Sequence, residues 1–490
     1  MIDLTRRSFV KSAALAGAAA ALHGCGFPIR RAHDVVVIGA GISGVAAARD
    51  MARAGMDVLV LEARDRVGGR IHTLHEPAPH GLEVGAQMIH GSRAATWELI
   101  REFGVQTRPF TEWDTWPWST AAGFHPPDAG LREGAEARLK AAYREYHGDD
   151  ESFQEFLVAK HFTTADREAV LEHALSWSAE PDEVSLRAAM EDEAAWESYF
   201  DRNYQVVGGY DTLPLKMAEG LGDRVRLSSV VQQIEWGRYG VLVSYHRDGR
   251  LEEARAARAA ITLPIGILQA GSPEFKPHLP PWKERAVQAL HMGRVVVVHF
   301  LFDTWFWRET VPGLPGWDTR GGRVSFWDPH PPGAGEPVLL GWITGTAAQE
   351  LSDLGEAAGR ERALAWVEEA FPLAGVKRRL RFSSLRDWIA DPYSRGSYSF
   401  TRPGGTTQRA VLATPVGDLL HFAGEATAAA PHYQTVHGAY ASGRRVAREI
   451  LSAMGRDDTI AALRPPSAPA ASRSALFFSG RALYPPAHTM

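Results

Sequence analysis

The chain has 490 residues, of which 45% are hydrophobic and 23% are charged; these fractions are typical of a folded globular protein and argue against a disordered, collagenous or coiled-coil chain. The formal net charge is −5 and no block of Lys and Arg stands out after residue 30, so nucleic acid is not expected as a partner. The single cysteine, Cys25, excludes internal disulfides and metal sites that need several cysteines.

Residues 1–30 resemble an export signal. Arg6 and Arg7 precede an uncharged stretch of small residues at 12–22, which is too short to span a bilayer about 30 Å thick. The pattern resembles a bacterial twin-arginine signal, which carries folded proteins, and Cys25 stands where a lipoprotein is cleaved and acylated. It predicts the twin-arginine export machinery as a partner and a bacterial periplasmic location, with or without a lipid anchor on Cys25. An unprocessed amphipathic helix is the alternative.

The next pattern predicts a βαβ unit. Residues 35–38 form an apolar, β-branched run typical of a buried strand, residues 45–54 favour a helix rich in small side chains, and residues 58–61 favour a second strand. Between the first strand and the helix stands GAGISG (residues 39–44), with the G-x-G-x-x-G spacing. Such glycines let the backbone approach a pyrophosphate, and the helix N-terminus supplies N–H donors and partial positive charge.

An acidic residue supports the same prediction. Glu62 ends the second strand 23 residues after Gly39, where a carboxylate can accept hydrogen bonds from both hydroxyl groups of a ribose. The two strands, the glycines and the acid are in register, so the sequence predicts a dinucleotide-binding unit.

The continuation EARDRVGGR (residues 62–70) places a second glycine turn and an arginine beyond the phosphates. From here the chain resembles the flavin-containing amine oxidase family, which includes monoamine and polyamine oxidases. The resemblance is colinear over about residues 33–450 and includes segments at 83–91, 207–213, 225–231, 263–266, 279–283, 388–398, 422–427 and 435–443. It implies FAD as the cofactor and a small-molecule amine as the substrate.

The resemblance also implies the residues that hold FAD. They are Gly39, Gly41, Ser43, Gly44, Glu62, Arg64, Gly69, Arg70, Gln87, Met88, Ile89, Val231, Glu425 and Val436. Glu425 is expected to bind ribityl hydroxyls, and a helix starting near Val436 to face the pyrimidine edge of the flavin, where negative charge gathers on reduction. Ser397 stands where some monoamine oxidases carry a flavin-linked cysteine, so the FAD is expected to be non-covalent.

The implied fold is α/β, with an FAD-binding, Rossmann-like domain of the glutathione-reductase/amine-oxidase type and a discontinuous α+β substrate domain. The FAD-binding domain is expected over 33–110, 205–265 and 384–455, and the substrate domain over 111–204 and 266–383. Residues 456–490 are rich in Pro and Ala and are expected to form a loose tail.

Members of the family oxidise an amine to an imine, which is then hydrolysed. They flank the amine with two aromatic side chains, whose positions fall on Tyr398 and Thr435, so only half of the pair is present. His90 is expected beside the flavin and near the substrate nitrogen. Plain packing for Tyr398 and a structural hydrogen bond for His90 are the alternatives.

The chain departs from the family at one further position. Four residues past Gly293 the family usually carries a lysine that assists reaction with oxygen, and this chain has Val297. Arg294 is on the opposite face of an extended strand and is not an obvious substitute. Electrons are therefore expected to pass to O2 or to a periplasmic acceptor, and the sequence leaves oxidase and dehydrogenase open.

Several interpretations remain open. Trp113, Trp116 and Trp118 either line a substrate tunnel or belong to the core. His432 and His437 have no acidic or cysteine partners at metal-ligand spacing, so no metal is expected. An L-amino-acid oxidase would share the flavin motifs but needs an arginine for the substrate carboxylate, and the sequence assigns none. A flavin-binding protein without amine turnover is the third possibility.

Overall fold

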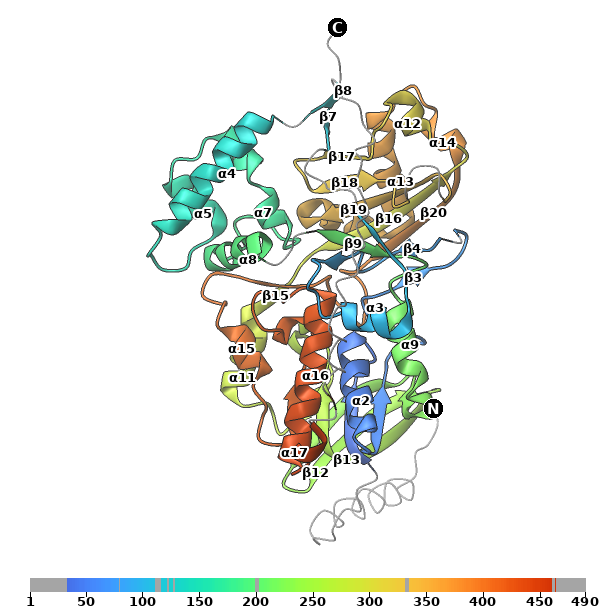
Figure 1. Ribbon diagram of the computed structural model, residues 1–490, viewed down its shortest axis with the longest axis vertical. Helices are drawn as coiled ribbons and strands as arrows, with labels where there is room; N and C mark the ends of the chain where they lie inside the picture. The colour runs from blue at the N-terminus through green and yellow to red at the C-terminus, as the bar shows by residue number, and fades with distance from the viewer. Residues whose placement is uncertain are drawn as a thin grey trace, which may run out of the picture.

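The computed structural model describes residues 33–78, 80–110, 116–120, 123–126, 128–198, 202–330, 335–460 and 463. The predicted export signal with Cys25 therefore lies outside the described residues. The molecule is elongated, with one sheet in the lower half of Figure 1 and a second sheet beside a group of helices in the upper half. Within the described part of the chain, no helix is both long and apolar enough to cross a membrane.

The lower sheet has eight strands among the described residues. They are ordered β10 (Val225–Arg226), β2 (Val58–Leu61), β1 (His33–Ile38), β13 (Arg250–Ile261), β12 (Gly240–Arg247), β11 (Val230–Gly237) and β14 (Glu274–Lys276), with β22 (Leu420–Phe422) paired to β13. The pairs β2–β1, β1–β13 and β13–β22 are parallel, and the apolar run of β2 is fully buried, as expected for parallel strands covered on both faces. Their carboxyl ends meet at one edge of the sheet.

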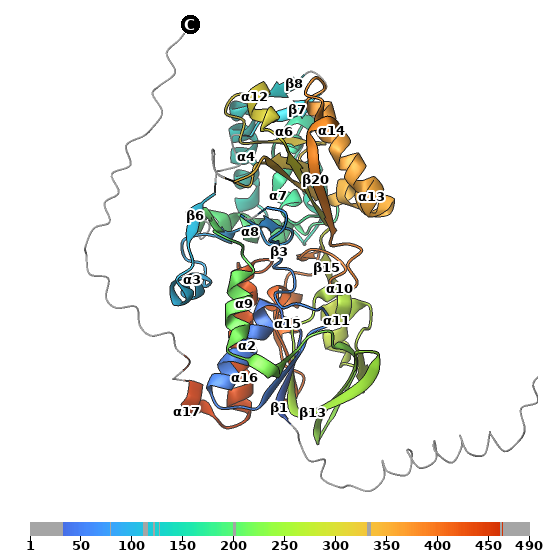
Figure 2. The same cartoon turned by 90° about the vertical axis from the view of Figure 1, so that its right-hand side faces the viewer.

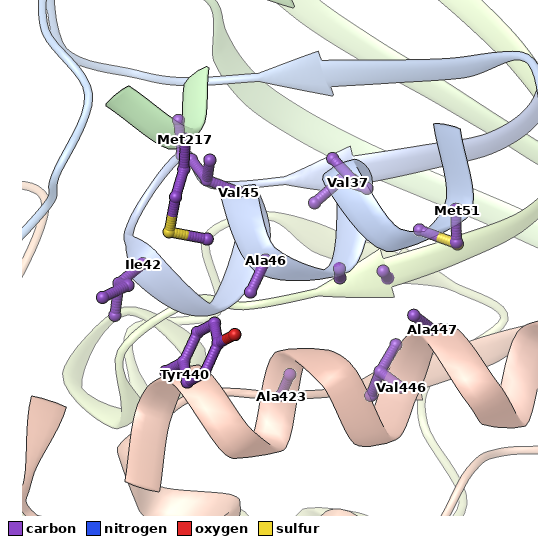
Figure 3. Close-up of a cluster of buried hydrophobic side chains, with 14 of the residues drawn as sticks. Val37, Ile42, Val45, Ala46, Met51, Met217, Ala423, Tyr440, Val446 and Ala447 are labelled. Atoms are coloured by element: carbon purple, nitrogen blue, oxygen red, sulfur yellow. The ribbon is translucent and has the colours of Figure 1, made fainter. Parts of the chain in front are cut away.

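Two helices from opposite ends of the sequence lie side by side against this sheet (Figure 1). α2 (Ile42–Arg53) and α16 (Val436–Ala453) face each other through small apolar side chains such as Ala46 and Ala447 (Figure 3). Gly443 permits this approach, because a methyl group there would overlap the carbonyl oxygen of Ser43. The sequence predicted the helix α2 over residues 45–54. In the structure it begins earlier, at Ile42, because the glycine turn leads directly into it.

The upper sheet has seven strands among the described residues. They are ordered β20 (Leu380–Asp387), β16 (Val295–Phe302), β19 (Val338–Thr344), β18 (Val324–Trp327), β17 (Gly316–Thr319), β7 (Trp118–Thr120) and β8 (Gly123–His125). Val296 and Val298 of β16 pack with α13 (Gly345–Ala370) on one face, while Val297 belongs to a cluster on the other. β20 pairs with β16 as far as Asp387, so the second insert runs slightly past the expected boundary at residue 383.

A group of helices with its own core completes the upper half (Figure 2). These are α4 (Ala129–Arg144), α5 (Phe153–Ala159), α6 (Thr164–Ala169), α7 (Glu172–Leu175) and α8 (Leu186–Ser198), which together are called the helical lobe below. Ser152 and Thr163 form capping boxes that begin α5 and α6.

Short elements connect these parts. The strands are β3 (Thr73–Leu74), β4 (Leu82–Glu83), β5 (Ile89–His90), β6 (Thr107–Pro109), β9 (Asn203–Val206), β15 (Leu290–Met292) and β21 (Ser399–Thr401). The helices are α3 (Trp97–Phe103), α9 (Thr212–Glu219), α10 (Ile265–Gln269), α11 (Pro281–Ala289), α12 (Phe306–Thr310), α14 (Val376–Arg379), α15 (Gln408–Ala413) and α17 (Asp457–Ile460). α17 lies in the stretch that was expected to be a loose tail.

Candidate active site

A cavity of about 1180 Å³ extends from the carboxyl edge of the lower sheet to the upper sheet and the helical lobe. Most of the residues predicted from the sequence line it: Gly39, Gly41, Ser43, Glu62, Arg64, Gly69, Arg70, Gln87, Met88, His90, Val231, Tyr398, Glu425, Thr435 and Val436. The two that do not are Gly44, which packs beneath the glycine turn, and Ile89, which is buried in the core beside α2. The structure thus brings residues from three separate segments to one space.

The glycine turn after β1 leaves the start of α2 open to the cavity. Gly39 has a φ of +102°, which favours glycine, and a side chain at Gly44 would overlap the Gly39 carbonyl oxygen. Gly41 caps α2 without any side-chain hydrogen bond, and a methyl group there would meet nothing within 4 Å. The helix N-terminus is therefore accessible to an anionic group.

The second glycine turn lies against the first. Gly41 and Gly68 form an isolated parallel bridge, and a methyl group at Gly69, which has a φ of +60°, would lie 3.3 Å from the Cα atom of Gly41. The second glycine turn, which the sequence predicted beyond the phosphate site, is therefore in contact with the first glycine turn.

Glu62 is fixed at the end of β2 by backbone donors. Its Oε2 atom accepts a hydrogen bond from Ala40 N at 2.6 Å, and its Oε1 atom accepts one from Arg64 N at 2.9 Å. Burial raises the pKa of this carboxyl group, although both backbone hydrogen bonds oppose the shift. The carboxylate is held in one orientation at the cavity wall.

Glu425 and Arg70 join the first and last segments of the chain. Arg70 Nη1 donates to Glu425 Oε1 at 2.9 Å and to Ser397 O at 2.6 Å. Glu425 also accepts from Ser399 Oγ at 2.7 Å and from Gln434 N at 3.3 Å. Burial alone would raise the pKa of Glu425, but Arg70 and the other positive and donor groups around it lower the pKa overall. Glu425 thus fastens three loops at the cavity, which its sequence position alone did not reveal.

Arg64 makes a second tie across the same edge. Its guanidinium donates to both carboxylate oxygens of Asp391, at 2.7 and 2.9 Å. Such a two-point contact holds the arginine more rigidly than a single bond.

Two buried polar atoms on the cavity wall can form hydrogen bonds with a ligand. Gln87 Oε1 and Ser397 Oγ are buried and have no hydrogen-bond partner within the described parts of the chain, and both residues line the cavity. Buried polar atoms are nearly always hydrogen-bonded in native proteins. With the open helix start, the fixed Glu62 carboxylate and a volume above the 300–1,000 Å³ usual for ligand sites, these atoms fit a flavin dinucleotide together with a small substrate.

Tyr398 belongs to a wall of aromatic side chains, which comprises Trp116, Trp327, Trp342, Trp388 and Tyr398 and is called the aromatic wall below. Its hydroxyl donates to Ser176 O at 2.9 Å and contacts the Ser178 hydroxyl. Burial raises the pKa of Tyr398 to about 12, so the phenol stays protonated at neutral pH. The sequence identified Tyr398 but carried no signal for Trp327 and Trp342.

Thr435 and His90 line the cavity with their polar atoms already engaged. Thr435 is the N-cap of α16: its Oγ1 atom accepts from Gly438 N at 3.0 Å and donates to His432 O at 2.7 Å. His90 Nδ1 lies 2.8 Å from Asn203 Oδ1, and burial lowers the pKa of His90. Thr435 therefore serves the helix start that faces the cavity, and His90 is a neutral imidazole there.

The position at which the sequence resemblance implies a lysine is apolar in this chain. Val297 is fully buried and packs in one cluster with Met88 and Trp388. Arg294 precedes β16 and pairs with Glu183, which lies between α7 and α8.

Two of the three predicted tryptophans can be placed. Trp116 and Trp118 both line the cavity, and Trp116 is also part of the buried cluster around Tyr398. Trp113 lies outside the described residues. Trp116 therefore fits both interpretations, because its side chain lines the cavity and is also buried in the core.

The helical lobe contributes a group of acidic residues that the sequence analysis missed. They are Asp128, Glu136, Glu168, Asp192 and Glu193. Asp192 is the member of this group whose negative charge, after burial, also raises the pKa of Tyr398. Glu136 pairs with Arg132 and Glu193 with Lys140, whereas Asp192 is a further carboxylate on this wall of the cavity.

Comparisons with known proteins show the family to which this chain is similar. The model of the family "Flavin containing amine oxidoreductase" matches residues 42–451. The chain is 31% identical to polyamine oxidase 4 of Oryza sativa subsp. japonica, over 87% of this chain and 91% of that protein. It is 28% identical to the flavin-containing amine oxidase B of Homo sapiens, over 86% and 87%. Its structure is similar to that of wild-type putrescine oxidase bound to putrescine, with a TM-score of 0.72 and 25% identity over 86% and 99% of the two chains.

Proposed function

The chain belongs to the family of flavin containing amine oxidoreductases, and from that membership we propose that it oxidises an amine with FAD as its cofactor. When bound, FAD supplies the acceptor for the two electrons and the hydrogen that leave the carbon next to the amine nitrogen. One observation carries this conclusion: the glycine turn after β1, Glu62 and Tyr398 line the same cavity. The dinucleotide-binding features and the aromatic wall therefore share one continuous space.

Different residues of the cavity bind different parts of the FAD molecule. The open N-terminus of α2 receives the pyrophosphate, and Glu62 accepts hydrogen bonds from the ribose hydroxyls. Gln87 Oε1 and Ser397 Oγ are acceptor and donor groups for the remainder of the dinucleotide. Arg70 and Glu425 hold the loops that carry these groups.

The aromatic wall prepares the amine. Its apolar surfaces exclude water and favour an uncharged amine, which is the form that can lose a hydrogen with its bonding electrons. His90 is neutral because burial lowers its pKa, so it adds no positive charge that would repel a substrate cation. The side chains around Tyr398 are close-packed, and they hold the substrate in a restricted orientation.

The substrate we propose is an amine that carries a second positively charged group. The acidic side of the cavity supports this, because Asp192 lies near Tyr398 and a cation there would be attracted to it. Two similar proteins are named for polyamines and for putrescine. A comparison of 1,4-diaminobutane with butylamine tests the idea, and equal kcat/KM for the two amines would contradict it.

The reaction itself is tested by anaerobic mixing of the purified, FAD-loaded protein with primary amines, polyamines and L-amino acids. Bleaching of the flavin absorbance by amines alone is expected. Bleaching by amino acids alone would identify an L-amino-acid oxidase, and an absence of bleaching by any of them would point to a flavin-binding protein without turnover.

The electron acceptor we propose is a periplasmic carrier rather than O2. The apolar cluster around Val297 supports this, because it offers no ammonium group to stabilise negative charge on reduced oxygen. Reoxidation of the reduced protein is measured with air-saturated buffer and with a quinone or a cytochrome. Rapid reoxidation by air would identify an oxidase.

Export to the bacterial periplasm by the twin-arginine machinery is proposed from residues 1–30 alone. Replacement of Arg6 and Arg7 by Lys should retain the protein in the cytoplasm of a bacterial host, and labelled fatty acid on the wild type but not on Cys25→Ala would identify a lipid anchor. Because Ser397 replaces the cysteine used for flavin attachment, we also propose that acid precipitation releases all of the FAD.

A further inference from the structure

The hydroxyl group of Tyr398 is held by the helical lobe. Tyr398 precedes β21, whereas Ser176 and Ser178 follow α7, about 220 positions earlier in the chain. The phenol has one hydrogen, and it is donated to Ser176 O at 2.9 Å. The Ser178 hydroxyl must therefore donate its own hydrogen to the phenol oxygen. Both bonds use the hydroxyl and leave the ring to face the cavity.

Ser178 is itself fixed in an unusual conformation. It has a φ of +54°, which is uncommon outside glycine, and it is completely buried. Its carbonyl oxygen accepts a hydrogen bond from Arg294 N at 2.7 Å. A methyl group at Gly293 would lie 2.7 Å from Trp177 O and 3.0 Å from Ser178 Cβ. The serine is thus pressed against the backbone that leads into β16.

Ion pairs hold the rest of this segment to the upper sheet. Glu180 accepts from Arg323 Nε at 3.0 Å and from Thr346 N at 2.8 Å. Glu183 pairs with Arg294 and, at 3.0 Å, with Arg402. The position of Ser178 therefore depends on two sheets and not only on the helix before it.

We propose that Ser178 is a positioning residue, which fixes the ring of Tyr398 against the substrate and keeps its hydroxyl away from the amine. This inference rests on the proposed amine oxidation. Without the serine hydroxyl, the phenol can turn towards the cavity and bind the amine nitrogen in an unproductive pose. Because a misplacement of about 1 Å can cost about 100-fold in rate, loss of this bond should lower the rate constant of flavin reduction more than it changes amine affinity.

A double-mutant cycle of Ser178→Ala, Tyr398→Phe and the double variant tests this. We expect each single variant to lower the rate constant of anaerobic flavin reduction at saturating amine by about tenfold, with less than a threefold change in the amine Kd. The double variant should lose no more than Tyr398→Phe alone, because the Ser178 hydroxyl acts only through the phenol oxygen that Tyr398→Phe removes. Multiplying effects, or wild-type reduction by Ser178→Ala, would overturn the proposal.

Ser185→Ala is the matched control, because Ser185 is also a completely buried serine between α7 and α8, and its hydroxyl contacts Asp150 and Ala188 N, which do not line the cavity. Flavin reduction in this variant should equal that of the wild type. If Ser178→Ala does not fold, Ser178→Gly replaces it, since glycine accepts the φ of +54° and equally lacks the hydroxyl.

A measurement independent of turnover separates this inference from the proposed function. The chain has 12 tyrosines, and labelling with 3-fluorotyrosine gives a fluorine resonance for Tyr398 that is identified by its absence in Tyr398→Phe. Ser178→Ala should move or broaden that resonance and Ser185→Ala should not. An unmoved resonance would contradict the positioning role of Ser178 even if no amine is oxidised. A moved resonance without flavin bleaching would contradict only the proposed function.

Discussion

Val297 lies directly opposite Trp342 in the antiparallel pairing of β16 with β19. Directly paired residues point to the same face of a sheet, and both side chains belong to the cluster around Trp388. The position at which the sequence resemblance implies a lysine is therefore part of a continuous apolar surface.

Replacing Val297 by Lys should accelerate reoxidation of the reduced flavin by air, by about tenfold, because an ammonium group stabilises the negative charge that develops on oxygen. The buried lysine should also lower the melting temperature, since a charge is costly among these aromatic side chains. Stopped-flow mixing of the reduced protein with oxygenated buffer measures the rate. Val297→Met is the control, because it changes volume without charge; equal acceleration by Met would show that charge is not the cause.

Gly41→Ala should weaken FAD binding without destabilising the apoprotein. A methyl group at Gly41 meets nothing within 4 Å in the protein and enters the cavity where the pyrophosphate is expected. Titration with FAD should show at least a tenfold higher Kd, and the melting temperature of the apoprotein should match the wild type.

Gly443→Ala is the contrasting variant, because its methyl group would overlap the carbonyl oxygen of Ser43 between α2 and α16. Overpacking of this kind costs about 1–3 kcal/mol, so the apoprotein should melt at a lower temperature.

An unchanged FAD affinity in Gly41→Ala would contradict the assignment of the open start of α2 to the pyrophosphate.

Asp192→Asn should reduce the selectivity for diamines. Loss of the negative charge on the cavity wall removes an attraction for the second ammonium group of a diamine, which butylamine lacks. We expect kcat/KM for 1,4-diaminobutane to fall about tenfold and that for butylamine to stay within twofold. Glu133→Gln is the control, because it removes a carboxylate of α4 that does not line the cavity. Parallel losses for both amines in Asp192→Asn would refute the selectivity role.

Glu83 should make stability depend on pH in a predictable direction. Burial raises the pKa of Glu83 from 4.5 to about 8, so the folded protein binds a proton that the unfolded chain has already released. Stability from this group is therefore complete below about pH 4.5 and declines as the pH rises towards 8. In Glu83→Gln, the fall in melting temperature between pH 5 and pH 8 should be smaller than in the wild type. An identical pH dependence would show that Glu83 titrates normally.

The sequence by itself determined those parts of the site whose residues lie close together along the chain. The glycine spacing at 39–44 and the acid at Glu62 predict the βαβ unit because strand, turn and helix are consecutive. The structure places both on one cavity wall. The helix that the resemblance implied near Val436 begins at that residue in the structure.

Only the tertiary structure decided what faces the flavin site from the substrate side. Trp342 lies opposite Val297 because of the pairing register between β16 and β19. Asp192 and Ser178 come from a region whose placement depends on distant ion pairs such as Glu180–Arg323. Glu425 contacts Arg70, 355 positions away, through a hydrogen bond that no local spacing encodes. Local periodicity specifies which residues form an element, but the packing of whole elements specifies which side chains meet, and that information is spread over the entire chain.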